Sequence, residues 1–154
     1  MKRDIPPREW YAHFSPVQSV WGDMDALGHV NNVLYFRYAE TARLDYMQKM
    51  GTQVPGLDKR MWQDDGMILA EITCRFLQQL RAPADLMLGT RVARMGDKTL
   101  FFETSMYLGD ATQPVAVVDA VIVWFNFQTQ KAISIPQEVR DAVMKIEVRA
   151  PEQV

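Results

Sequence analysis

The hydrophobic positions of this 154-residue chain change their period about one third of the way along. From Val33 to Met50, apolar residues recur at spacings of three and four, which is the period of one helix face. Either of two asparagines, Asn31 and Asn32, can cap the start of this helix, and Gly51 is placed to end it. The pattern predicts a helix over residues 33–50 that is about 27 Å long. Its expected buried face consists of Tyr35, Ala39, Ala42, Tyr46 and Met50.

Beyond this helix, a loop-rich connection is expected from Gly51 to Gly66, and the hydrophobic period then becomes two. Alternating positions of this kind are typical of strands with one buried face. Met95-Gly96-Asp97-Lys98 predicts a hairpin turn, because glycine tolerates the positive φ that such turns require. The most apolar run is expected to form the central strand. The predicted strands cover Phe14–Trp21, Met67–Leu80, Leu86–Ala93, Leu100–Leu108 and the apolar run Val115–Phe127, and a terminal helix is predicted over Pro136–Val148.

One strand, one long helix and several antiparallel strands make an α+β pattern. Such a sheet must bury one face, and the helix at 33–50 is the only element long enough to cover it. Residues 14–150 are therefore expected to form one domain, preceded by a flexible lead-in over residues 1–13. A sheet curled around a single helix leaves strand edges open, and pairing between two chains would close them, so a homodimer is expected.

Composition narrows the range of functions. The formal net charge of −2 argues against a general nucleic-acid binder, which needs an excess of Lys and Arg. The single cysteine, Cys74, excludes an intrachain disulfide and a cysteine metal cage. No segment approaches eighteen uninterrupted apolar residues, and the N-terminus lacks the features of a signal peptide, so neither a membrane span nor export is indicated and the cytoplasm is expected.

The densest group of chemically useful residues precedes the long helix, in Asp23-Met24-Asp25-Ala26-Leu27-Gly28-His29-Val30-Asn31-Asn32. A helix start offers unpaired N–H groups and partial positive charge, so a carboxylate beside it can act on a polarised carbonyl. The segment therefore predicts an acyl-transfer site in which a carboxylate is the acting group. The alternative is that Asp25 only shapes the turn, which is the usual role of Asp before a helix and the favoured interpretation of Asp23.

The longer run W-G-D-M-D-A-L-G-H-V-N-N-V-L-Y-F-R-Y-A-E-T-A-R resembles the signature of hotdog-fold acyl-CoA thioesterases of the 4-hydroxybenzoyl-CoA thioesterase type. The resemblance is closest to the bacterial branch that hydrolyses longer-chain acyl-CoAs. Two further segments fit this branch: the break at Arg81-Ala82-Pro83, and the strand and turn from Val117 to Ala132. Together the similarity covers roughly Val17 to Met144.

The resemblance implies an antiparallel sheet wrapped around one central helix, in dimers or tetramers with active sites at the dimer interface. It assigns the essential carboxylate to Asp25 and the carbonyl-polarising amide to the backbone N–H of Asn32. A different hotdog branch carries a catalytic Glu beside a His-Gly-Gly element, which this chain lacks, so Asp25 is favoured over Glu40. The implied substrate is a medium- to long-chain acyl-CoA, and neither a metal nor another cofactor is required.

Several roles in the predicted site stay open. His29 could orient Asp25, donate to the thioester or contact the pantetheine arm, or it could only fix the loop. The expected substrate-binding residues are Gly28, Val30, Asn31 and Tyr35, although Gly28 could serve only the backbone shape, Asn31 only the helix cap and Tyr35 only the core.

Two other functions compete with acyl-CoA hydrolysis. One is hydrolysis, at the same site, of acyl groups held by acyl carrier protein, and the other is a hotdog module that binds acyl-CoA without turnover. The chain contains no G-x-S-x-G, P-loop, G-x-G-x-x-G, H-E-x-x-H or C-x-x-C motif. A serine hydrolase, a nucleotide hydrolase, a dinucleotide oxidoreductase or a zinc enzyme is therefore not indicated.

Overall fold

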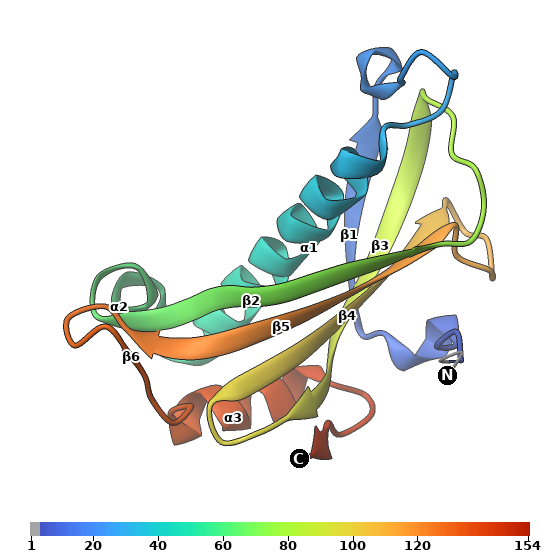
Figure 1. Ribbon diagram of the computed structural model, residues 1–154. Helices are drawn as coiled ribbons and strands as arrows, with labels where there is room; N and C mark the ends of the chain where they lie inside the picture. The colour runs from blue at the N-terminus through green and yellow to red at the C-terminus, as the bar shows by residue number, and fades with distance from the viewer. Residues whose placement is uncertain (1–3) are drawn as a thin grey trace.

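A computed structural model describes residues 4–154 of the chain. Its sheet is antiparallel along the strand order β1-β3-β4-β5-β2, and two short strands extend it: β6 pairs with β5, and β7 runs parallel to β3. The sheet curls around α1, the arrangement of a hotdog fold (Figure 1). The elements in chain order are η1 (Arg8–Trp10), β1 (His13–Ser19), η2 (Trp21–Asp23), α1 (Asn32–Gln53), α2 (Leu57–Gln63), β2 (Asp65–Phe76), β3 (Ala84–Met95), β4 (Thr99–Leu108), β5 (Ala116–Asn126), β6 (Lys131–Ala132), α3 (Gln137–Ile146) and β7 (Glu152–Gln153).

The α1 helix buries the face that its hydrophobic period predicted, since all five expected residues are buried. The predicted end at Gly51 is wrong, because α1 continues to Gln53. The expected loop after it is also wrong in part, since α2 occupies residues 57–63. Leu57 and Met61, four residues apart, are both buried there, so this short helix closes one end of the core.

Two predicted features of the sheet need correction. β2 ends at Phe76 and not at Leu80, because the N–H groups of Leu77 and Gln78 both turn to the carbonyl of Val115. The apolar run of β5 does not occupy the middle of the sheet. β4 holds that position, and β5 lies between β4 and β2. The turn at 95–98 is confirmed, since β3 ends at Met95 and β4 begins at Thr99, but Gly96 does not adopt the positive φ that was expected of it.

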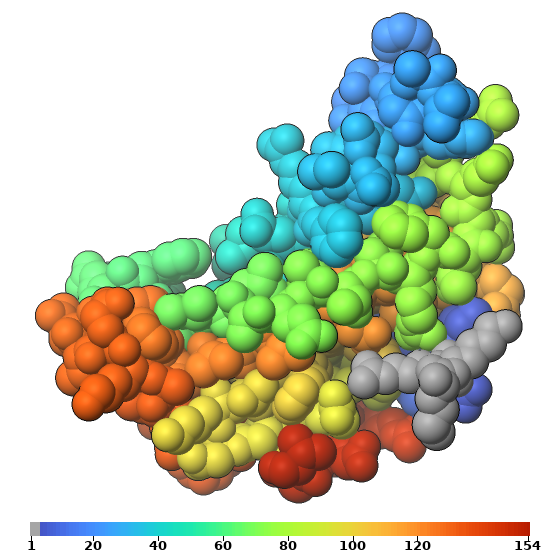
Figure 2. All heavy atoms as spheres, viewed as in Figure 1, coloured from blue at the N-terminus to red at the C-terminus, as the bar shows by residue number. Residues whose placement is uncertain are grey.

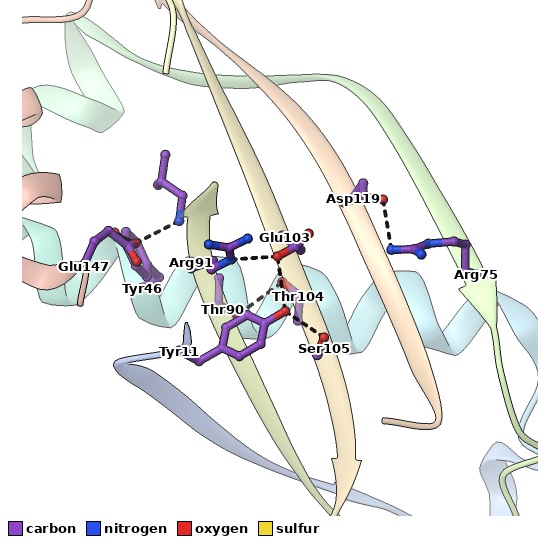
Figure 3. Close-up of polar contacts among 11 residues, drawn as sticks. Tyr11, Tyr46, Arg75, Thr90, Arg91, Glu103, Thr104, Ser105, Asp119 and Glu147 are labelled. Atoms are coloured by element: carbon purple, nitrogen blue, oxygen red, sulfur yellow. Dashed lines mark hydrogen bonds and ion pairs between the residues drawn. The ribbon is translucent and has the colours of Figure 1, made fainter. Parts of the chain in front are cut away.

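The predicted lead-in is packed over much of its length. Residues 1–3 lie outside the described residues, but Tyr11 is buried and its hydroxyl lies 2.7 Å from the Ser105 hydroxyl (Figure 3). Gly89 makes room for the Tyr11 ring, because a Cβ atom at position 89 would lie 2.7 Å from its Cγ. The next element, β1, begins at His13. The packed part of the domain therefore begins before residue 14.

The core forms two clusters along α1. One surrounds its first half, where Tyr35 and Ala39 pack with Leu86 and Met106 of the sheet. The other surrounds its second half and includes α2 and α3. Both clusters lie between the helix and the concave face of the sheet, so the start of α1 is held firmly at one end of the domain.

Candidate active site

The loop between η2 and α1 is folded by its own backbone. The Asp25 N–H donates to the His29 carbonyl at 2.8 Å, and the Gly28 N–H donates to the Asp25 carbonyl at 3.0 Å. Gly28 has a φ of +76°, a conformation that residues with a side chain rarely adopt. Gly28 therefore serves the shape of this turn, and it does not line the cleft described below.

The Asp25 carboxylate lies at the surface and is bonded on one side only. Its Oδ1 accepts the N–H groups of Leu27 at 2.8 Å and His29 at 3.4 Å. This is the hydrogen bonding of a turn-forming aspartate. Among residues 4–154, the other oxygen, Oδ2, has no hydrogen-bond or ion-pair partner. One oxygen thus fixes the loop, and the other is open to a ligand.

Asp23 has the structural role that was favoured for it. Its Oδ2 accepts the Tyr38 hydroxyl at 2.6 Å and the Val20 N–H at 2.9 Å, and its own carbonyl accepts the Asn31 N–H at 2.9 Å. The hydrogen bond from Tyr38 first, and that from Val20 next, hold the pKa of the Asp23 carboxyl below its usual range. Asp23 therefore ties the loop to α1.

The start of α1 leaves one amide open. Asn31 caps the helix, since its Oδ1 accepts the Val33 N–H at 3.1 Å and its carbonyl accepts the Leu34 N–H at 2.9 Å. The Asn31 N–H is itself engaged by Asp23. Within the described chain, the N–H of Asn32, the first residue of α1, has no acceptor. This N–H points out of the helix at the positive end of the helix dipole.

A cleft of about 470 Å³ lies beside this helix start. Tyr35 and Val30 are buried in its wall, and the Tyr35 ring packs edge-on against Phe76 with centroids 5.0 Å apart. In Figure 2 the start of α1 (cyan) lies against the segment that follows β2 (green). The residues lining the cleft are His29, Val30, Asn32, Tyr35, Phe76, Leu77, Gln78, Gln79 and Leu80.

His29 brings a polar atom to the wall of the cleft. Its ring nitrogen Nε2 is shielded from solvent and has no hydrogen-bond partner among the residues that the structure describes. A buried polar atom without a partner is costly, so an unpaired one beside a cleft points to a ligand. The backbone of His29 meanwhile holds Asp25 through two hydrogen bonds.

Four of the seven predicted site residues therefore line the cleft together: His29, Val30, Asn32 and Tyr35. Asp25, Gly28 and Asn31 belong to the loop and cap beside it. The sequence missed the segment 76–80, which forms the opposite wall. This segment was interpreted as the end of a strand, and its position depends on the bond from the Val30 N–H to the Leu80 carbonyl.

Other chemistries find little support in the part of the chain that the structure covers. No group of three or more His, Cys, Asp or Glu side chains there is arranged to hold a metal ion. Burial raises the pKa of the Cys74 thiol to about 11, so this cysteine is a protonated, half-buried group and not a nucleophile. None of the helices in residues 4–154 is long and apolar enough to span a membrane.

Comparison with known proteins gives consistent matches. The model of the thioesterase-like superfamily matches residues 19–143. The PA5185 protein of Pseudomonas aeruginosa strain PAO1 has a similar structure, with a TM-score of 0.79 and 29% identity over 94% of this chain and 98% of that one. A thioesterase of Thermus thermophilus, solved with coenzyme A and Zn, has a TM-score of 0.76 and 23% identity over 92% and 98% of the two chains.

A plant protein also matches. The chloroplastic acyl-acyl carrier protein thioesterase ATL3 of Arabidopsis thaliana is 20% identical over 118 residues, which make up 77% of this chain and 60% of that protein. The superfamily match includes the loop, α1 and the four long strands β2 to β5. The candidate site therefore lies inside the matched region.

Proposed function

Because the chain belongs to the thioesterase-like superfamily, we propose that it hydrolyses acyl-CoA to a free carboxylic acid and coenzyme A. We place it with the 4-hydroxybenzoyl-CoA thioesterase type, in the branch that acts on medium- to long-chain fatty acyl groups. The observation that carries the proposal is the open Asn32 amide at the mouth of an apolar cleft, in the same loop as the open oxygen of Asp25.

In this proposal the thioester carbonyl oxygen accepts the N–H of Asn32. The positive end of the α1 dipole then stabilises the negative charge that develops on this oxygen. Asp25 Oδ2 takes a proton from water while the water oxygen bonds to the carbonyl carbon. The C–S bond breaks as the tetrahedral intermediate collapses, and the leaving coenzyme A thiolate takes the proton held by Asp25.

A second route uses the same atoms. Asp25 Oδ2 attacks the carbonyl carbon itself, the thiolate leaves, and water then hydrolyses the acyl–Asp25 anhydride. Both routes need a thioester carbonyl within reach of Asn32 and Asp25, and both return the carboxylate unchanged. Neither route needs a metal, because a thioester carbonyl is already electrophilic and a thiolate leaves readily.

The acyl group fits the lining of the cleft. Val30, Tyr35, Phe76 and Leu80 offer apolar surface, and burying a methylene group there yields about 0.8 kcal/mol. His29 Nε2 is placed to donate to the thioester or to the pantetheine arm. Asp25 is exposed in the single chain, so its surroundings must be completed by the substrate and a second copy, in a homodimer or a homotetramer.

The test is a panel of thioesters run on the wild-type chain. It should contain short, medium, long and aromatic acyl-CoAs, each matched by the same acyl group on acyl carrier protein. We expect the highest kcat/KM on medium- to long-chain acyl-CoA. Faster turnover of the carrier-protein thioesters would favour the activity named for the Arabidopsis relative. Tight binding of acyl-CoA without turnover of any member would reject the hydrolase and establish a binding module.

A further inference from the structure

β2 has an open edge. One of its edges pairs with β5 from Asp65 to Phe76, and the other pairs with no strand among residues 4–154. Along this strand the apolar side chains of Ile68 and Leu69 are exposed, as is Phe76 at its end. An open, partly apolar strand edge is a template for pairing with another chain.

The two ends of β2 carry different structures. The cleft lies at its end, between the start of α1 and the segment 76–80. α2 lies at its start and carries Trp62, whose side chain is 70% exposed and lines a second, largely apolar groove of about 540 Å³. Figure 1 shows α2 beside the start of β2, with the start of α1 toward the other end of the strand.

The family resemblance implies dimers with their active sites at the interface, and this open edge is where a second copy can pair. We propose that Trp62 of that second copy forms the far wall of the acyl site. Antiparallel pairing of a strand with its own copy reverses it, so the start of one β2 meets the end of the other. A two-fold axis normal to the sheet produces this pairing and keeps both α1 helices on the same side. α2 of the second copy then lies over the cleft.

Charge and register favour this pairing. Glu71 and Arg75 point to the same face of β2, because they are four residues apart. A register centred on Thr73 sets each Glu71 opposite Arg75 of the second copy, where Arg75 also lies 3.9 Å from Asp119 of its own chain. The same register brings the start of the second copy's β2 level with the segment 77–80. Cross-strand pairs of opposite charge are favourable, and the symmetry supplies two of them.

In this arrangement the two copies supply different parts of each acyl site. One copy supplies Asp25, Asn32 and His29, and the other supplies an indole ring over the distal part of the acyl chain. This inference rests on the proposed thioesterase function, and it makes Trp62 a determinant of chain length. We expect Trp62→Ala to lower kcat/KM about tenfold for long-chain acyl-CoA and to leave short-chain acyl-CoA nearly unchanged.

Hybrid dimers test the arrangement. Two differently tagged chains, one Asp25→Asn and the other Trp62→Ala, are co-expressed, and the hybrid is isolated by sequential affinity steps. If Trp62 acts across the interface, one of its two sites has both wild-type residues, and long-chain activity returns to about half the wild-type value. If Trp62 acts within its own chain, the hybrid has no intact site and stays at or below the Trp62→Ala level, which overturns the proposal.

The reciprocal hybrid is the matched control. It pairs a wild-type chain with a chain carrying both Asp25→Asn and Trp62→Ala. Under the proposal this hybrid lacks an intact site and has low long-chain activity, whereas a site within one chain would give half-activity. Trp62→Phe should keep the long-chain preference, and Gln63→Ala, which changes an exposed neighbour on α2, should have no effect.

The oligomeric state is a further readout. A wild-type chain that is active as a monomer in light scattering would overturn the proposal. A wild-type chain that forms the dimer but hydrolyses no thioester would instead reject the proposed function, because it leaves no activity for the hybrids to divide. The two failures are therefore distinguishable.

Discussion

Asp25 and Glu147 both accept backbone N–H groups, and their surroundings differ. Asp25 lies exposed on a loop, where one oxygen holds the turn and the other is open. Glu147 lies at the end of α3, and its Oε1 accepts the Tyr46 hydroxyl at 2.5 Å and the Val92 N–H at 2.8 Å (Figure 3). Burial raises the pKa of the Glu147 carboxyl to about 6.

The position of Glu147 explains its burial. On the outer edge of β3, pairing with β1 ends at Thr90 and pairing with β7 begins at Arg94. Val92 falls in the gap, and the Glu147 carboxylate satisfies its N–H. The comparison teaches that the carboxylate with the raised pKa completes the sheet. The proposed reacting carboxylate is the exposed one, and under the proposal the substrate and a second copy surround it.

Replacing each carboxylate by its amide should separate the two roles. We expect Asp25→Asn to lower kcat at least a hundredfold, the lower range for the loss of a general base, because the amide can neither accept the proton nor attack. Its Oδ1 can still accept the Leu27 N–H, so the melting temperature should stay close to wild type. Initial rates on the best acyl-CoA and a thermal melt measure both effects.

Glu147→Gln is the control for that experiment, since it makes the same chemical change far from the cleft. It should keep kcat within about twofold of wild type. Near-normal turnover by Asp25→Asn, or a collapse of turnover in Glu147→Gln with the fold intact, would reverse the assignment of the two carboxylates.

The second prediction concerns pH. The folded pKa of Glu147, about 6, exceeds its ordinary value of 4.5, so folding favours the protonated form. The resulting stability is fully present below pH 4.5 and is lost as the pH rises to about 6. Relative to Glu147→Gln, the free energy of unfolding of wild type should therefore fall by on the order of 2 kcal/mol across this window and stay level above it.

Urea unfolding of both proteins between about pH 4 and pH 7 measures this difference. Groups that are common to the two proteins cancel in the comparison, which leaves the titration of Glu147 alone. Curves that stay parallel across the window would show that the carboxylate is not desolvated, and the contrast with Asp25 would then disappear.

The sequence predicted what local patterns encode. The buried face of α1 and the turn at 95–98 both follow from spacings within a few residues, and the structure confirms them. The opposite wall of the cleft, the segment 76–80, could not be found in this way, because it is held by contacts with Val30 and Val115, which are distant in sequence. The hydrophobic pattern did not predict α2, because this seven-residue helix buries only Leu57 and Met61.

The candidate site shows the same difference between features encoded locally and features that depend on distant contacts. Asp25, His29 and Asn32 are close in sequence, and their motif drew attention to them before any contact was known. The free amide of Asn32 and the unpaired Nε2 of His29 are visible only once the hydrogen bonds of the loop are assigned. The exposed Trp62 had no local signal at all, because its proposed role depends on a strand edge that only the sheet order reveals.

The smallest expected effect belongs to His29, whose backbone supports Asp25 while its ring faces the cleft. His29→Ala keeps both backbone hydrogen bonds to Asp25 and removes only the ring, so turnover should weaken about tenfold without being abolished. His13→Ala is the matched control. That ring contacts Asp45, with 3.2 Å between His13 Nε2 and the carboxylate Oδ2, and does not line the cleft, so its loss should alter stability and not turnover.

The kinetic constants of His29→Ala decide among the roles of the ring. A lower kcat with unchanged KM means that Nε2 donates to the thioester or orients Asp25 as the reaction proceeds. A higher KM with unchanged kcat means that the ring binds the pantetheine arm equally in the ground and transition states. Unchanged values of both would mean that only the backbone of His29 matters. The orphaned ring nitrogen would then need a partner from the second copy, and the cleft would be a smaller part of the site than its lining suggests.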